Sequence, residues 1–228
     1  HQFLPHEVNY RANIFALKSL GARRVLGFSA AGSLRKEIRP GELALTAQYF
    51  DHTRGKRNYS FFGGGVSAHV STAYPTCPAF GADITDAATR IDETLHVNKT
   101  YACVEGPRLG TRAESFFLRD SAQSDLVGMT NVPEVFLARE AQLAYCTLCL
   151  VTDYDCWMDD PEEHVSVDKF FATYQGTLAK AQAVLAELLK QPLRPTPAEV
   201  RHSLAGAVLT PDEALTEAQR TWLAVLRC

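Results

Sequence analysis

The sequence lacks the features that mark several classes of protein. It has no excess of basic residues: its 228 residues carry a formal net charge of -3, which does not favour a nucleic-acid binder held by phosphate contacts. It contains no uninterrupted apolar run of membrane-spanning length, and no internal repeat or low-complexity segment. Hydrophobic residues make up 46% and charged residues 21% of the chain, which is typical of a globular protein with a buried core.

The six cysteines do not favour a disulfide framework. Most lie among apolar neighbours, as Cys103 does between Ala102 and Val104. Buried thiols in a reducing cytosol account for this pattern, so we expect a cytoplasmic protein. Cys146 and Cys149 have CxxC spacing but fall in a predicted strand, where residues three apart point to opposite faces. We therefore predict no metal or redox site.

Apolar and polar segments alternate in a pattern that predicts an α/β fold with a mixed, mostly parallel central sheet flanked by helices. Strands are expected at residues 24–29, 42–50, 99–104, 126–129 and 145–152, and helices at 9–20, 83–95, 111–122, about 131–142 and about 167–189. Asn131 and Glu134 have the spacing of a capping box at a helix start. Residues 1–190 are predicted to form the main domain, and residues 191–228 a proline-rich linker and helical tail.

Three motifs fall at the carboxyl ends of predicted strands, where the sites of α/β folds usually lie. The small residues 29–33 (SAAGS) predict a turn whose backbone N–H groups could hold an anion, although a tight strand-to-helix turn needs the same residues. In the second motif, residues 128–130 (GMT), Thr130 could donate to phosphate and Met129 could pack on a sugar. A core methionine and an ordinary turn are the alternative.

The third motif contains the acidic pair Asp153 and Asp155. Two positions apart in a continued strand, these side chains would point to the same side. Two neighbouring carboxylates resist ionising together, so the pKa of one should rise. A protonated acid beside an ionised one offers a donor to N7 and an acceptor to the 6-amino group of adenine. A solvated acidic turn or a divalent-cation site is the alternative.

Residues 51–65 are predicted to form a surface loop, and the basic cluster at 54–57 (RGKR) is typical of a solvated one. His69 follows this loop, and a lone histidine is usually structural or exposed. No Ser-His-Asp arrangement and no metal-ligand triad can be assigned from the spacing.

Eight stretches, in order along the chain, resemble the methylthioadenosine phosphorylase branch of the purine nucleoside phosphorylases. They are residues 5–14 (PHEVNYRANI), 31–34 (AGSL), 105–108 (EGPR), 111–115 (TRAES), 128–130 (GMT), 132–134 (VPE), 137–140 (LARE) and 151–157 (VTDYDCW). The resemblance covers residues 1 to about 190, and more loosely to about 210. One such motif is weak, but eight in order are specific.

This resemblance implies phosphate-dependent cleavage of 5′-methylthioadenosine to adenine and 5-methylthioribose 1-phosphate. It implies a homotrimer with inorganic phosphate as co-substrate and no metal or organic cofactor. By position, phosphate would be bound by Ser29, Ala30 and Thr130. Met129 would contact the ribose, Asp153 would act on purine N7 as the catalytic acid, and Asp155 would bind the 6-amino group. Further substrate-binding positions are Leu109, Gly110, Tyr154, Val167, Phe170, Phe171 and, reaching into the neighbouring subunit's site, His69.

The chain departs from the family pattern in two places. The family's glycine-rich phosphate loop and a following Arg-His pair would lie before His1, so we expect an N-terminally incomplete chain with half of the phosphate site. Leu109 and Gly110 replace a usual phenylalanine and serine, and the leucine resembles a methylthioinosine-cleaving branch that lacks the Asp-Tyr-Asp pattern. A methylthioinosine or general purine nucleoside phosphorylase, and a non-catalytic nucleoside-binding or trimer-forming fragment, therefore stay open as alternatives.

Overall fold

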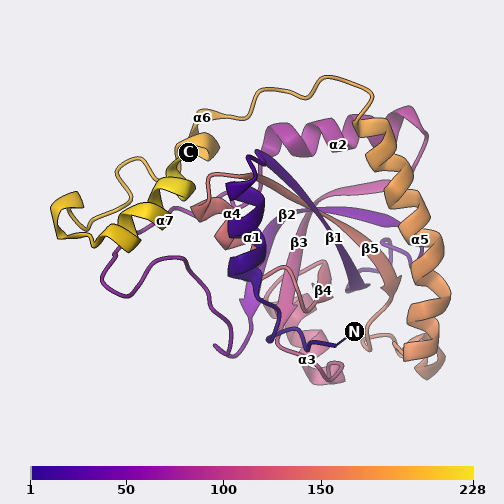
Figure 1. Ribbon diagram of the computed structural model, residues 1–228. Helices are drawn as coiled ribbons and strands as arrows, with labels where there is room; N and C mark the ends of the chain where they lie inside the picture. Colours follow the sequence, from indigo (N-terminus) through magenta and orange to yellow (C-terminus); the bar gives the residue numbers. More distant parts are fainter. Residues whose placement is uncertain (1) are drawn as a thin grey trace.

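The computed structural model describes residues 2–228, apart from the side chains of residues 161 and 169, and in this range five strands form its centre. They are β1 Arg24–Ser33, β2 Leu43–His52, β3 Leu95–Val104, β4 Leu126–Gly128 and β5 Ala144–Asp153. The strands close into a barrel in the order β1-β4-β3-β2-β5 (Figure 1). The pairs β1–β5, β2–β3 and β3–β4 are parallel, whereas β1–β4 and β2–β5 are antiparallel. The predicted mixed, mostly parallel sheet is confirmed, and its closure into a barrel was not predicted.

Helices cover the barrel on two sides. They are α1 Tyr10–Ser19, α2 Pro78–Arg90, α3 Arg112–Phe116, α4 Glu134–Glu140, α5 Val167–Leu188, α6 Ala198–Arg201 and α7 Glu217–Arg227. A π-helical turn, Phe117–Ser121, continues α3. Figure 1 shows α2 and α5 on one side of the strands and α1, α4 and α7 on the other. The Asn9 side chain accepts from the Ala12 N–H (3.0 Å) at the start of α1, which supports the predicted helix there.

Strand β5 contacts the helices on both sides of the barrel. All ten of its residues are buried, as expected of a strand covered on both faces. Tyr145, Cys149 and Val151 pack with residues of α1 and α4, whereas Cys146 and Leu148 pack with residues of α2 and α5. Cys146 and Cys149 therefore lie on opposite faces, as predicted.

The predicted turn at residues 29–33 is wrong, because β1 runs through to Ser33. Ser29 and Ala30 pair with Cys149 and Leu150 in the parallel ladder, and an irregularity follows only at Ala31 and Gly32. The local run of small residues looks like a turn, but the neighbouring strand uses its backbone groups. The backbone of these residues is therefore extended rather than turned.

Two helix starts also differ from prediction. Helix α4 begins at Glu134 with Pro133 as its N-cap, so Asn131 does not cap it. The Glu134 carboxylate instead accepts from the Tyr145 hydroxyl at 2.7 Å, a tertiary contact that competes with the local capping box. Helix α2 begins at Pro78, five residues earlier than predicted, because proline suits the first turn of a helix. It ends at Arg90, and Leu95 already belongs to β3.

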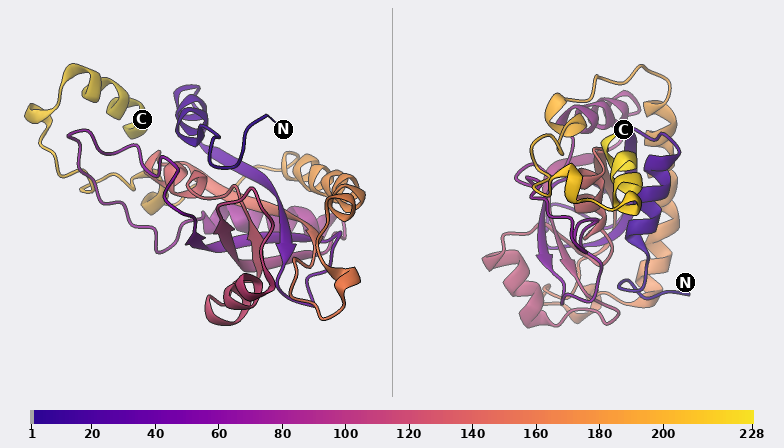
Figure 2. Two further views of the ribbon diagram at one scale, coloured as in Figure 1. Left: turned by 90° about the horizontal axis from the view of Figure 1, so that it is seen from below. Right: turned by 60° about the vertical axis from the view of Figure 1, so that its left-hand side comes forward.

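The C-terminal segment crosses the molecule after α5 and packs beside α1. Its Leu226 carbonyl accepts from Gln142 Nε2 (3.1 Å), and Val208 forms a β-bridge with Ala68. Figure 2 shows α7 alongside α1 in its right-hand view. The division of the chain at residue 190 stays a prediction. Over residues 2–228, no helix is long and apolar enough to cross a membrane.

Candidate functional site

The candidate phosphate residues meet because β4 runs antiparallel to β1. Gly32 pairs with Val127, so the chain beyond Gly128 runs back along β1 towards Ser29. Ser29 Oγ lies 3.3 Å from Thr130 Oγ1. The Ser29 side chain is buried, whereas Thr130 is exposed. The two hydroxyls thus stand together at a surface-accessible point, and the Ala30 carbonyl accepts from the same Ser29 hydroxyl at 3.3 Å.

The acidic pair lies at the end of β5, but not in a continued strand. Strand β5 ends at Asp153, and Asp155 takes a left-handed conformation with φ 52°. The Asp155 N–H donates to Asp153 Oδ1 at 2.8 Å, and the Thr152 hydroxyl donates to Asp153 Oδ2 at 2.7 Å. The predicted geometry is therefore wrong in its backbone, although a tight turn does bring the two aspartates together.

Both aspartates are 7% exposed, and burial raises the pKa of each. The hydrogen bonds from Thr152 and from the Asp155 N–H lower the pKa of Asp153 in part. The charge of Asp153 raises the pKa of Asp155 further, but less than burial does. The sequence predicted a raised pKa from mutual repulsion in one aspartate; burial is instead the larger cause, and it acts on both.

Two glycines frame the acidic pair. A Cβ on Gly32 would lie 2.8 Å from Asp153 Oδ1, so only glycine leaves room for that carboxyl. A Cβ on Gly110 would lie 3.8 Å from both carboxyl oxygens of Asp155, an ordinary contact distance. Gly110 is thus brought to Asp155, and Leu109 beside it is 46% exposed.

The Tyr154 side chain makes different contacts from those of its two neighbours. Its hydroxyl donates to the Lys36 carbonyl at 3.1 Å, and its ring meets the edge of Trp157. Tyr154 and Asp153 both line a pocket of about 340 Å³, together with Glu162 of the connection to α5 and Thr173 of α5. The beginning of α5 therefore lies over the end of β5, as Figure 1 shows.

The aromatic residues predicted for the methylthio pocket lie on the first turns of α5. Phe170 packs against Phe171 and Tyr174, with ring centroids 5.2 and 5.4 Å away. Phe171 is 57% exposed and Val167 is 65% exposed. Among the described residues, no hydrogen bond or ring contact joins this group to Met129 or to the acidic pair, so its role stays a prediction.

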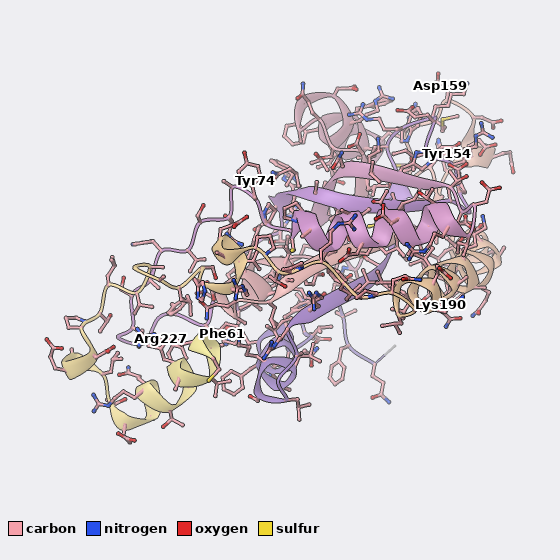
Figure 3. The ribbon with its side chains drawn as sticks, turned by 90° about the horizontal axis from the view of Figure 1, so that it is seen from above. Phe61, Tyr74, Tyr154, Asp159, Lys190 and Arg227 are labelled. Atoms are coloured by element: carbon pink, nitrogen blue, oxygen red, sulfur yellow. The ribbon has the colours of Figure 1, made fainter. Side chains whose placement is uncertain are left out.

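His69 stands apart from the other candidates. It is exposed, and its backbone N–H donates to the Ala207 carbonyl at 3.0 Å in the C-terminal segment. Figure 3 shows Phe61, of the same loop, beside α7 and Tyr154 at the other end of the molecule. Among the described residues, no hydrogen bond or ring contact links His69 to the acidic pair. Its predicted place in a neighbouring subunit's site is untested.

Sequence reasoning missed Arg57, which was expected in a solvated loop. Its side chain is 0% exposed and forms an ion pair with Glu105 at 3.0 Å, whereas Arg54 and Lys56 are exposed as predicted. An arginine among polar and glycine residues carries no sequence signal of burial, because its partners come from the distant segments that follow β3 and β4. Over residues 2–228, no group of His, Cys, Asp and Glu could hold a metal ion.

Comparison with known proteins identifies the family. A family model described as the Phosphorylase superfamily matches residues 1–191. The S-methyl-5′-thioadenosine phosphorylase of Geobacter sulfurreducens is 41% identical over 215 residues, which are 94% of this chain and 74% of that protein. The chain belongs to the methylthioadenosine branch of this superfamily.

Other members of the branch are similar in sequence and in structure. The enzyme of the same name from Thermococcus kodakarensis is 45% identical over 209 residues, 92% of this chain and 77% of that protein. A methylthioadenosine phosphorylase from an antarctic soil metagenomic library has a TM-score of 0.90 at 40% identity, over 99% of this chain and 79% of that one. A variant of adenosine/methylthioadenosine phosphorylase from Schistosoma mansoni, in complex with adenine, has a TM-score of 0.85 at 32% identity, over 92% and 81%. This phosphorylase therefore shares the fold of an enzyme that binds adenine.

Proposed function

We propose that this phosphorylase converts 5′-methylthioadenosine and inorganic phosphate to adenine and 5-methylthioribose 1-phosphate. The observation that carries the proposal is the buried pair Asp153 and Asp155, whose pKa values burial raises. Such a pair can hold one proton between two carboxyls, which gives a donor beside an acceptor. The N7 and 6-amino group of adenine require that combination, and the names of the relatives agree with it.

The reaction then divides between two parts of the site. Asp153 donates a hydrogen bond or its proton to purine N7 as the C1′–N9 bond breaks and its electron pair moves to the purine. For this step, the proton that the pair shares must lie on Asp153 once the base is bound. Asp155 accepts from the 6-amino group and orients the base. Phosphate held at Ser29, Ala30 and Thr130 faces the positively charged ribose, and one of its oxygens forms the new bond to C1′. Met129 packs on that ribose. A donor at N7 acts mainly on the transition state, because charge develops there only as the bond stretches.

Phosphate-dependent release of adenine by the full-length protein tests this function. We expect adenine from methylthioadenosine when phosphate is present, none when it is omitted, and no loss of activity after metal chelation. Absence of release from every purine thionucleoside would defeat the proposal and leave the non-catalytic nucleoside-binding alternative. Turnover would exclude that alternative.

Two residues at positions 109 and 110 favour a second candidate substrate. Gly110 places no side chain against the Asp155 carboxyl, and Leu109 supplies no aromatic face. Both features fit a phosphorylase that accepts 6-oxopurine nucleosides such as methylthioinosine. Rates for methylthioadenosine, adenosine and methylthioinosine measured side by side decide between the two, and we expect methylthioadenosine to be preferred because Phe170 and Phe171 offer an apolar wall to the methylthio group.

We also propose that the protein works as a cytoplasmic homotrimer. The exposure of His69 supports a role in a neighbouring subunit's site, and five buried cysteines without disulfides support a reducing compartment. Sedimentation gives the number of subunits. Co-expression of the His69→Ala and Asp153→Asn variants adds a functional test. Only a site shared between subunits lets these two inactive variants form one active site together, and no recovery in mixed oligomers would contradict this role of His69.

A further inference from the structure

The Arg57 guanidinium joins the end of β3 to the segment that follows β4. Nη1 donates to the Met129 carbonyl at 2.8 Å and to the Val132 carbonyl at 2.5 Å. On the other side, Nε donates to Glu105 Oε1 and Nη2 to the Glu105 carbonyl, each at 3.0 Å. Nη2 also donates to the Val104 carbonyl at 3.4 Å. One planar group thus donates to four carbonyls and a carboxylate, and its fork shape makes this possible.

The two carbonyls on Nη1 enclose Thr130. Met129 and Val132 stand on either side of Thr130 and Asn131, so bonds to both fix the path of the two residues between them. The side chains of Met129 and Thr130 also contact other segments of the chain. Met129 Sδ would lie 2.5 Å from a Cβ on Gly106, and Thr130 Oγ1 lies 3.3 Å from Ser29 Oγ. The direction of the Thr130 hydroxyl therefore depends on where Arg57 holds the backbone.

The surroundings of the Arg57 side chain leave no space for a substrate to contact it. Its side chain is 0% exposed, and the Tyr10 ring stands over the guanidinium, with the centroid 5.8 Å from Cζ. The Glu105 carboxylate that neutralises it also accepts from the Arg54 N–H at 2.7 Å. Burial raises the pKa of Glu105, but the hydrogen bonds from Arg54 and Arg57 together lower it by more, so the net pKa falls and the pair stays ionised.

We propose that Arg57 is a positioning residue, which sets the geometry of Met129 and Thr130 for the ribose and phosphate without touching either. The proposal rests on the proposed function for its kinetic consequence, but not for its structural one. Ordinary core arginines stabilise a fold as a whole. Arg57 is distinguished by donating to the backbone on both sides of one candidate ligand.

The Arg57→Lys variant tests this role, with Arg54→Lys as the matched control in the same loop. Lysine keeps the charge beside Glu105, but its ammonium cannot reproduce the planar fork. A misplacement of about 1 Å can cost about 10²-fold in rate, so we expect kcat/KM for phosphate to fall by up to about that factor. The Arg54→Lys protein, in which an exposed side chain changes and the backbone bond to Glu105 remains, should keep wild-type constants.

Hydrogen exchange supplies a readout that does not depend on catalysis. In Arg57→Lys, amides of residues 129–132 should exchange faster, while those of α5 exchange as in the wild type. Added methylguanidinium should restore slow exchange, and phosphate affinity, in Arg57→Ala. A wild-type rate at residues 129–132 in both Arg57 variants would overturn the proposal, as would faster exchange spread evenly over the chain. If the wild type showed no phosphorolysis, the function would fail while the exchange result still decided the role of Arg57.

Discussion

The phenol of Tyr101 occupies the space where a side chain on Gly128 would stand. A Cβ on Gly128 would lie 2.7 Å from Tyr101 Cζ and closer still to Oη. Tyr101 is fully buried, and its hydroxyl lies 3.4 Å from Ser29 Oγ. Glycine at this point of β4 therefore lets the strand pass Tyr101 and deliver Thr130 to Ser29.

This relationship predicts opposite effects for two glycine-to-alanine changes. Gly128→Ala should destabilise the fold by about 1–3 kcal/mol, because the added methyl forces the buried ring or the strand to move. Gly176→Ala should instead stabilise it by about 0.4–1 kcal/mol, because a Cβ there meets nothing within 4 Å and the site lies inside α5. Urea unfolding of the two variants measures both effects. A Gly128→Ala midpoint equal to that of the wild type would show that Tyr101 moves aside without loss of stability.

Replacement of the proposed acid should change both the rate and its pH dependence. In the wild type we expect kcat/KM to fall as pH rises through the raised pKa of Asp153, because only the neutral form can give a proton to N7. Asp153→Asn should lose about 10²–10⁴-fold and lack that alkaline fall. Asp159→Asn is the control, since the Asp159 side chain is fully exposed. An Asn variant with the wild-type pH profile would contradict the role of Asp153.

Asp155→Asn should shift substrate preference towards methylthioinosine. The carboxylate accepts from a 6-amino group, whereas an amide can also donate to a 6-oxo group. Competition between methylthioadenosine and methylthioinosine gives the ratio of their kcat/KM values directly. A ratio equal to that of the wild type would remove Asp155 from base recognition.

The same variant should be more stable than the wild type at neutral and alkaline pH. Because burial raises the pKa of Asp155, the folded state holds its proton more tightly than the unfolded chain does. The stability that this proton contributes is fully present below the unfolded pKa and is lost as pH rises through the folded pKa. Asparagine avoids this loss and tolerates the left-handed φ of 52°.

We therefore expect a gain in Tm that is larger at pH 8 than at pH 4. For a chain of this size, each 1 kcal/mol of added stability corresponds to a rise in Tm of about 2–4 °C. Thermal unfolding at the two pH values measures it. A gain that is the same at both values would assign the effect to the backbone conformation alone.

Short stretches of sequence were sufficient to predict the helices and strands that depend mainly on interactions between neighbouring residues. The Asn9 cap marks the beginning of α1, and the continuous apolar run from Ala144 marks β5. Predictions failed where a distant partner decides the structure. Small residues at the end of β1 predicted a turn, but pairing with β5 keeps them extended, and Tyr145 takes the Glu134 carboxylate away from the expected cap.

The sequence alone therefore determined the type of fold, the family and the identity of the acidic pair, because periodicity and ordered motifs carry that information. Only the tertiary structure decided how the site is assembled. The antiparallel course of β4 along β1 brings Thr130 to Ser29, the turn at Asp155 joins it to Asp153, and burial acts on both acids. Arg57 shows the physical reason: the environment of a charged side chain depends on groups far away in sequence, whose approach only the folded chain defines.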